Sequence, residues 1–276
     1  MAITAQDVNK LRQQTGAGMM DCKKALTEAN GDFEAAIDIL RKKGQKVSAS
    51  RSDRETSEGS VFVKTNDDAT ESVIIALNCE TDFVAKNEEF QALGQSILNV
   101  AFENRPASID DLKGTKLGDL TINEKIVELI GKIGEKLEIS AYESLKGEKV
   151  VPYIHAGSKL GVLVALKGSN GDDTSDAGRD VAMQIAAMNP VAVDKDEVDQ
   201  SVVDREIEIG KEQARAEGKP EQIIEKIAQG KLQKFFKENT LLNQAFVKDS
   251  SLSVAKYLDS VKSGLTVEAF KRISIG

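Results

Sequence analysis

The chain has 276 residues, 30% of them charged, and a net charge of -8, as expected for a water-soluble protein of two or more modules. Its lysines are scattered among acids, so the basic face of a nucleic-acid binder is not expected. The first residues lack the apolar core of a signal peptide, and no apolar run is long enough for a membrane span. The two cysteines, Cys22 and Cys79, lie far apart, which argues against a disulfide framework or zinc site. We therefore expect a cytoplasmic protein with no membrane partner.

Residues 1–44 have the caps and apolar spacing of a bundle of three short helices, the last of which is predicted to end at Gly44. Met19 and Met20 follow two glycines at the start of the second helix. Adjacent methionines suit an adaptable apolar contact, although the core of so small a bundle is an equally good place for either one. Residues 45–59 contain almost no large apolar side chains and are predicted to be a linker, flexible or partly helical.

The middle of the chain is predicted to form an α+β core of two related halves, residues 60–135 and 136–190, with antiparallel sheets. The order strand, strand, helix occurs over residues 60–102 and again over 149–188. The second strands of these two runs, "SVIIALN" and "GVLVALK", are similar to each other. This pattern indicates an internal repeat.

Residues 191–240 are charged and predict two helices of about twenty residues each, about 30 Å long at 1.5 Å per residue. Gly218-Lys219-Pro220 marks a stop and a restart between them. We expect a protruding antiparallel helical hairpin, or coiled coil. Residues 241–276 become apolar again and are predicted to pack on the core, with a last strand at "AFKRISIG".

One stretch, "NCETDFVAK", continues the second strand of the first half, whereas the second half has an ordinary turn there. It places the acid Asp82 beside the bulky Phe83 within Thr81-Asp82-Phe83-Val84. Phe83 either closes the core or is held out for a partner, and burial of a Phe is worth about 1.5–3 kcal/mol in either case. The extra stretch in one half favours a function in binding.

Signs of catalysis are weak. No phosphate-binding glycine loop follows a strand, and no metal-ligand cluster or cofactor motif is visible. Cys79 with His155, the single histidine, would be a conceivable nucleophile pair, but nothing else in the sequence supports a hydrolase. A lone histidine is more often a hydrogen-bonded structural residue. The sequence therefore indicates a binding protein that is not an enzyme and needs no cofactor or metal.

Five segments together resemble bacterial elongation factor Ts, the family of guanine-nucleotide exchange factors for elongation factor Tu. They are "TGAGMMDCKKALTEANGDFEAAI", "NCETDFVAKNEEF", "YIHAGSKLGVLVALKG", "EGKPEQIIEKIAQGKLQKFF" and "LLNQAFVKD". They span nearly the whole chain in the expected order. The resemblance implies a ubiquitin-associated-like (UBA-like) N-terminal bundle that binds the GTPase domain, and a hairpin that dimerises or protrudes.

The resemblance also implies roles for particular residues. The motif at Thr81, Asp82, Phe83 and Val84 would disturb the magnesium and phosphate site of elongation factor Tu. Met19 and Met20 would lie on the N-terminal contact, and Ile133, Gly134 and His155 near the Phe83 contact. A homodimer or a heterotetramer with the partner would both be compatible with the family, and no direct nucleic-acid contact is expected.

The sequence departs from the family in two places. Residues 46–59 differ from the family's linker, and the chain ends at Gly276, where some members continue into a further module. A different class of protein remains as an alternative: a UBA-like adaptor or RNA-binding module that acts through residues 1–44 and would not need the long core.

Overall fold

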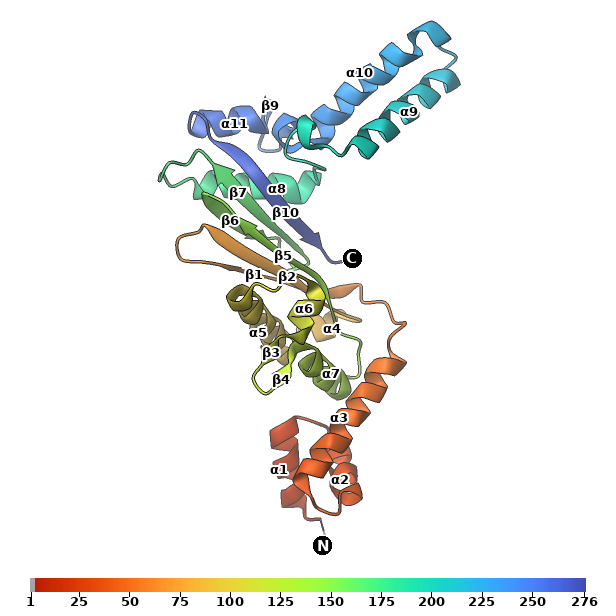
Figure 1. The fold of residues 1–276 in the computed structure, drawn as a ribbon, viewed down its shortest axis with the longest axis vertical. Helices are drawn as coiled ribbons and strands as arrows, with labels where there is room; N and C mark the ends of the chain where they lie inside the picture. The colour runs from red at the N-terminus through yellow and green to blue at the C-terminus, as the bar shows by residue number, and fades with distance from the viewer. Residues whose placement is uncertain (1–2) are drawn as a thin grey trace.

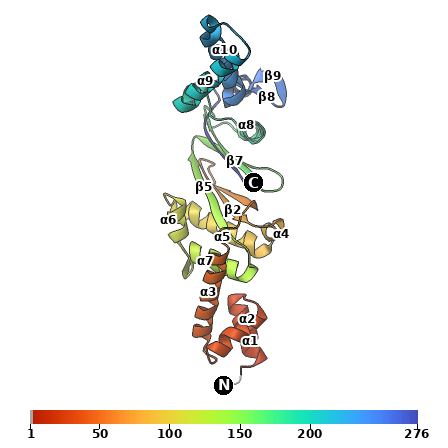
Figure 2. The same ribbon diagram turned by 90° about the vertical axis from the view of Figure 1, so that its right-hand side faces the viewer.

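The computed structural model describes residues 3–276 and confirms the expected α+β class. Figure 1 shows an elongated molecule in which a helical bundle, a two-part core with sheets, and a helical hairpin follow one another along the long axis. The bundle and the hairpin lie at opposite ends, and the view in Figure 2 shows the same order. None of the helices within residues 3–276 is long and apolar enough to cross a membrane.

The N-terminal bundle consists of α1 (Ala5–Thr15), α2 (Met19–Glu28) and α3 (Phe33–Ser50). Its small core is closed by six buried side chains, Val8, Leu11, Cys22, Ala25, Leu26 and Ala36. The predicted end of the third helix was wrong, because α3 continues through Gly44 to Ser50. A glycine inside a helix usually costs stability, but here it permits a close helix crossing. A Cβ added to Gly131 of α7 (Ile122–Ile133) would lie 2.7 Å from the Gly44 Cα.

The first sheet has the order β1-β2-β5, with both pairs antiparallel. The strands are β1 (Glu58–Thr65), β2 (Glu71–Cys79) and β5 (Glu138–Lys146). The expected division at residue 136 assigned β5 to the second half. Strand β5 instead pairs with β2 in the first sheet, because α7 returns the chain to the free edge of that sheet.

The second sheet has the order β10-β7-β6, again antiparallel. Its strands are β6 (Lys149–Ile154), β7 (Leu160–Lys167) and β10 (Thr266–Ser274). The chain's last strand thus completes this sheet, as β5 completes the first. In each sheet the central strand is the second strand of the predicted repeat.

The two sheets pack face to face, and helices cover their outer faces (Figure 1). Outside the first sheet lie α5 (Glu88–Asn104) and α7, and outside the second lie α8 (Ser175–Met188) and α11 (Val254–Val261). Alternate residues of β2 serve both layers: Val73, Ile75 and Leu77 face the helices, while Ile74 and Ala76 face the other sheet. A strand buried on both faces needs a continuous apolar run, which explains "SVIIAL" and "GVLVAL".

Short elements connect these layers. In the first half they are α4 (Asp82–Ala85), α6 (Ile109–Gly114), β3 (Lys116–Leu117) and β4 (Leu120–Thr121). In the second they are η1 (Lys195–Glu197), η2 (Leu241–Asn243), β8 (Ala245–Phe246) and β9 (Asp249–Ser253).

The predicted hairpin is formed by α9 (Gln200–Ala216) and α10 (Glu221–Asn239), which stand away from the core (Figure 1). Gly218 makes the turn with φ +72°, a conformation that favours glycine. The seam is thin: Gly210 packs on Ala228, and the other buried side chains are Ala214, Ile224 and Leu232. The hairpin is therefore a charged pair of helices with one narrow apolar stripe.

Candidate partner-binding site

The stretch after β2 turns into a short helix instead of continuing the strand, so that expectation was wrong. Strand β2 ends at the buried Cys79, and Thr81 is the N-cap of α4. The Thr81 hydroxyl accepts a hydrogen bond from the Val84 N–H at 3.4 Å, as N-cap residues do. Val84 and Ala85 point into the first core, and this leaves Phe83 on the opposite side of the turn.

Phe83 is 83% exposed, the largest exposed fraction among the large apolar side chains of residues 3–276. Its neighbour Asp82 is also exposed and accepts a hydrogen bond from Lys86 Nζ at 2.7 Å. That hydrogen bond and the lysine charge lower the pKa of Asp82 below its ordinary value, so the carboxylate is charged at neutral pH. The tip of α4 thus presents an aromatic ring beside a carboxylate. Of the two sequence alternatives for Phe83, the structure excludes closure of the core.

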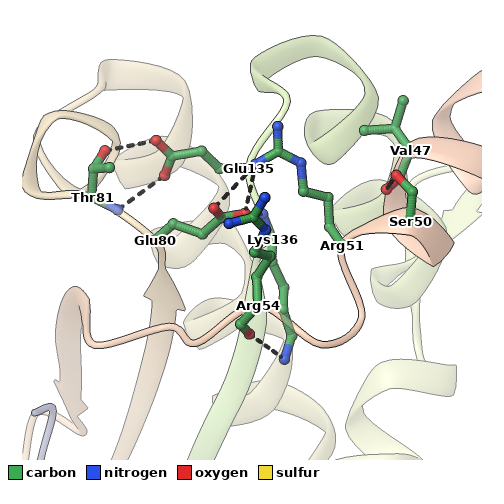
Figure 3. A network of polar contacts seen from close by, with 8 residues as sticks. All are labelled: Val47, Ser50, Arg51, Arg54, Glu80, Thr81, Glu135 and Lys136. Carbon is green, nitrogen blue, oxygen red and sulfur yellow. Dashed lines mark hydrogen bonds and ion pairs between the residues drawn. The ribbon is translucent and has the colours of Figure 1, made fainter.

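Residues distant in the sequence hold the N-terminal start of α4 in place (Figure 3). The Thr81 N–H donates to Glu135 Oε2 at 3.0 Å, and the Thr81 hydroxyl donates to Glu135 Oε1 at 2.7 Å. The preceding Glu80 accepts from the Lys136 N–H at 2.7 Å and from Arg51 Nη1 at 3.1 Å. Two adjacent residues before α4 are therefore bonded to two adjacent residues after α7.

Ile133 and Gly134 lie immediately before this anchor. Ile133 is partly buried against the first core, and Gly134 ends α7 with φ +82°. The turn that Gly134 makes brings Glu135 to Thr81. Sequence reasoning selected Ile133 and Gly134 by resemblance but missed Glu80, Glu135 and Arg51. No local pattern marks them, since Thr81 and Glu135 are 54 positions apart.

His155 lies just after β6, in the second sheet, and is exposed. Its Nδ1 is 2.9 Å from the Tyr153 hydroxyl oxygen. The turn that follows, with Gly157, Ser158 and Lys159, lines one surface depression together with Asp82 and Lys86. The structure thus brings the β6–β7 turn next to α4, although the turn joins strands of the second sheet and α4 follows a strand of the first.

Met19 and Met20 are the first two residues of α2, and both are more than half exposed. The structure thus decides the alternative that the sequence left open, since neither fills the bundle core. Helix α2 belongs to the bundle at the end of the molecule remote from the hairpin (Figure 1).

Cys79 does not have the properties of a catalytic nucleophile. Burial raises the pKa of its thiol to about 12, with the nearby carboxylates of Glu135 and Glu58 adding to the shift. The thiol donates to the Thr81 carbonyl oxygen at 3.1 Å. A reactive cysteine needs a lowered pKa and access, and Cys79 has neither. Within residues 3–276 no group of three His, Cys, Asp or Glu side chains could hold a metal ion.

Comparison with known proteins identifies the family. The family described as "Elongation factor TS" matches residues 80–276. Elongation factor Ts of Amoebophilus asiaticus is 60% identical over 276 residues, which cover 100% of both chains. That of Cytophaga hutchinsonii is 61% identical over 274 residues, with 99% of both chains covered, and that of Porphyromonas gingivalis is 51% identical over 276 residues, with 100% of this chain and 99% of the relative covered. The chain is thus a member of a class of translation elongation factors. The chain belongs to the elongation factor Ts family.

Proposed function

We propose that this protein is the guanine-nucleotide exchange factor for elongation factor Tu in the cytoplasm. It binds the GDP-loaded GTPase and promotes GDP release, after which GTP can load. Phe83 acts as a wedge against the part of the GTPase that supports its magnesium and phosphate site, and Asp82 acts beside it. The protein performs no covalent chemistry and carries no cofactor of its own.

The physical requirement for such a protein is differential affinity. An exchange factor shifts the equilibrium only if it binds the nucleotide-free GTPase more tightly than the GDP-loaded form. The coupling is reciprocal, so GDP weakens the complex by the same factor. A wedge that fits only after the magnesium site has opened meets this requirement, because its contact is made in one state alone.

The observation that carries the proposal is the exposure of Phe83 on a short helix whose other side is buried and anchored. A large aromatic side chain left in water gains nothing for the protein's own fold, whereas it could gain about 1.5–3 kcal/mol in a partner's pocket. A tip that is already held in place also loses less conformational entropy on binding.

The other surfaces have supporting roles in this proposal. Met19 and Met20 contribute affinity through the bundle, while Ile133, Gly134 and His155 surround the Phe83 contact. The hairpin of α9 and α10 contributes to assembly, as a homodimer or in a heterotetramer, and not to GDP release. No nucleic acid is required.

The test is release of a fluorescent GDP analogue from elongation factor Tu. We expect Phe83→Ala to slow release at least tenfold, about 1.4 kcal/mol in transition-state stabilisation. Ile223→Ala on α10 is a matched control, because it also removes an exposed apolar side chain, and we expect wild-type release. Wild-type release by folded Phe83→Ala would refute the proposal.

A further inference from the structure

We propose that Glu135 and Glu80 are positioning residues for the Phe83 tip, and that Arg51 couples them to the helix that carries the N-terminal bundle. This inference rests on the proposed exchange function and specifies how the wedge is held in place. None of the three residues touches the nucleotide site in this scheme. They act through Thr81, the N-cap of α4.

The first step of the argument is the geometry at Thr81. Helix α4 has four residues, too few to be stable without tertiary support. Glu135 receives both the N–H and the hydroxyl of Thr81, at 3.0 and 2.7 Å. Hydrogen bonds to a charged group are worth about twice as much as neutral ones. The Glu135 carboxylate alone thus fixes the start of α4 at Thr81, two residues before Phe83.

The second step is the set of contacts at Glu80, beside Thr81, which we call the Glu80–Lys136 clasp. Glu80 accepts from the Lys136 backbone N–H at 2.7 Å, and both of its oxygens lie within 3.2 Å of Arg51 Nη1. The Lys136 ammonium in turn donates to the Arg54 carbonyl oxygen at 3.1 Å. Figure 3 shows the result: the segment with Glu135 and Lys136 lies between the end of α3 and the start of α4, bonded to Thr81 on one side and to Arg54, in the stretch after α3, on the other.

The third step is the helix that bears Arg51. Helix α3 begins in the N-terminal bundle, with Ala36 in the bundle core. It then crosses α7 at Gly44, and Val47 packs against the core of the first half. Arg51 is the C-cap of this helix. One continuous helix therefore runs from the bundle with the exposed methionines to the clasp under the Phe83 tip.

Together these contacts make the bundle and the Phe83 tip one mechanical unit. A displacement of α3 would move Arg51, and with it Glu80 and the hydrogen bond between Glu80 and the Lys136 N–H. The same connection holds Thr81 through Glu135. A partner held by the bundle would thus meet Phe83 at a set distance and angle, which lowers the entropy lost in forming the second contact.

The experiment compares variants at Glu135 and Glu80 with a control at the opposite end of β2. Glu135→Ala removes both acceptors of Thr81, Glu135→Gln keeps one, and Glu80→Gln weakens the clasp. The control is Glu71→Gln. Glu71 begins β2 and pairs with Arg105 at 2.6 Å, and its side chain is 17% exposed against 16% for Glu80. Glu80→Gln and Glu71→Gln therefore each remove an arginine ion pair of similar exposure, one directly after the end of β2 and one at its start.

Two measurements distinguish positioning from general stability. The first is amide hydrogen exchange of residues 84–86 in the free protein, whose N–H groups bond to Thr81 and Asp82. We expect exchange about tenfold faster in Glu135→Ala, less in Glu135→Gln, and unchanged in Glu71→Gln. The second is GDP release from elongation factor Tu at saturating factor. We expect maximal release to fall at least tenfold in Glu135→Ala and Glu80→Gln, the lower end of the range expected for loss of a hydrogen bond to a charged group, and partial recovery in Glu135→Gln.

Arg51→Gln should have a smaller effect than Glu80→Gln, because Glu80 then still offers a charged acceptor to the Lys136 N–H, whereas the glutamine variant offers a neutral one. The variant that combines Arg51→Gln with Glu80→Gln should slow release by less than the two single effects added together, since both changes break the same ion pair. Unchanged hydrogen exchange at residues 84–86 in Glu135→Ala would overturn the inference. So would maximal release that falls equally in Glu71→Gln. If Phe83→Ala itself leaves release unchanged, the proposed function fails, while hydrogen exchange still decides whether Glu135 holds α4.

Discussion

Truncation of Phe83 should separate function from stability, because this side chain contributes little to the fold. Its exposed fraction of 83% leaves about 17% buried. A Phe that buries about 200 Å² when fully enclosed then buries only about 35 Å² here. At about 25 cal/mol per Å² the loss in Phe83→Ala is about 0.9 kcal/mol.

Phe90 provides the matched comparison eight positions from the start of α4. It is fully buried in the first core, so Phe90→Ala should lower the free energy of unfolding by about 3–5 kcal/mol. Two changes of the same kind, seven residues apart, should therefore differ at least threefold in their effect on stability.

Urea denaturation followed by circular dichroism measures both values. We expect the midpoint to change little in Phe83→Ala and strongly in Phe90→Ala. GDP release should be slowed at least tenfold by the first variant and kept by the folded fraction of the second. A loss of 3 kcal/mol or more in Phe83→Ala would mean that Phe83 packs internally, and the wedge reasoning would be refuted.

Three further predictions concern the bundle and the thiol. Gly131→Ala should push α3 away from α7, since the added Cβ would lie 2.7 Å from the Gly44 Cα. Proteolysis within residues 51–57 should therefore accelerate. The control Gly230→Ala, whose added Cβ meets open space, should leave the rate of proteolysis unchanged. The Cys79 thiol, with its pKa raised to about 12 by burial, should stay protonated and resist iodoacetamide at pH 8 until urea is added; rapid alkylation of the native protein would contradict this. Met19→Asp combined with Met20→Asp should leave melting unchanged but weaken binding to elongation factor Tu at least tenfold, and normal release at low factor concentration would show that this surface is misassigned.

The sequence by itself determined the local elements well. The repeat of strand, strand and helix was visible because a strand buried on both faces needs a continuous apolar run. The hairpin was visible because Gly218-Lys219-Pro220 interrupts two helical patterns. The helix caps that predicted the N-terminal bundle are likewise present, as at Thr4, which caps α1. In each case the decisive interaction lies within a few residues, so composition and spacing are enough.

Three features depended on contacts between distant segments. Gly44 has the pattern of a helix end, but its packing on α7 makes it the middle of α3. The pairing of β5 with β2 is a choice between two sheet edges of similar chemistry, and local sequence does not distinguish them. The exposure of Phe83 follows from α4, a single turn whose N-cap is held by Glu135 from 54 positions away. A four-residue helix cannot be stable by its own propensity, so only the tertiary structure could decide that this aromatic ring faces water.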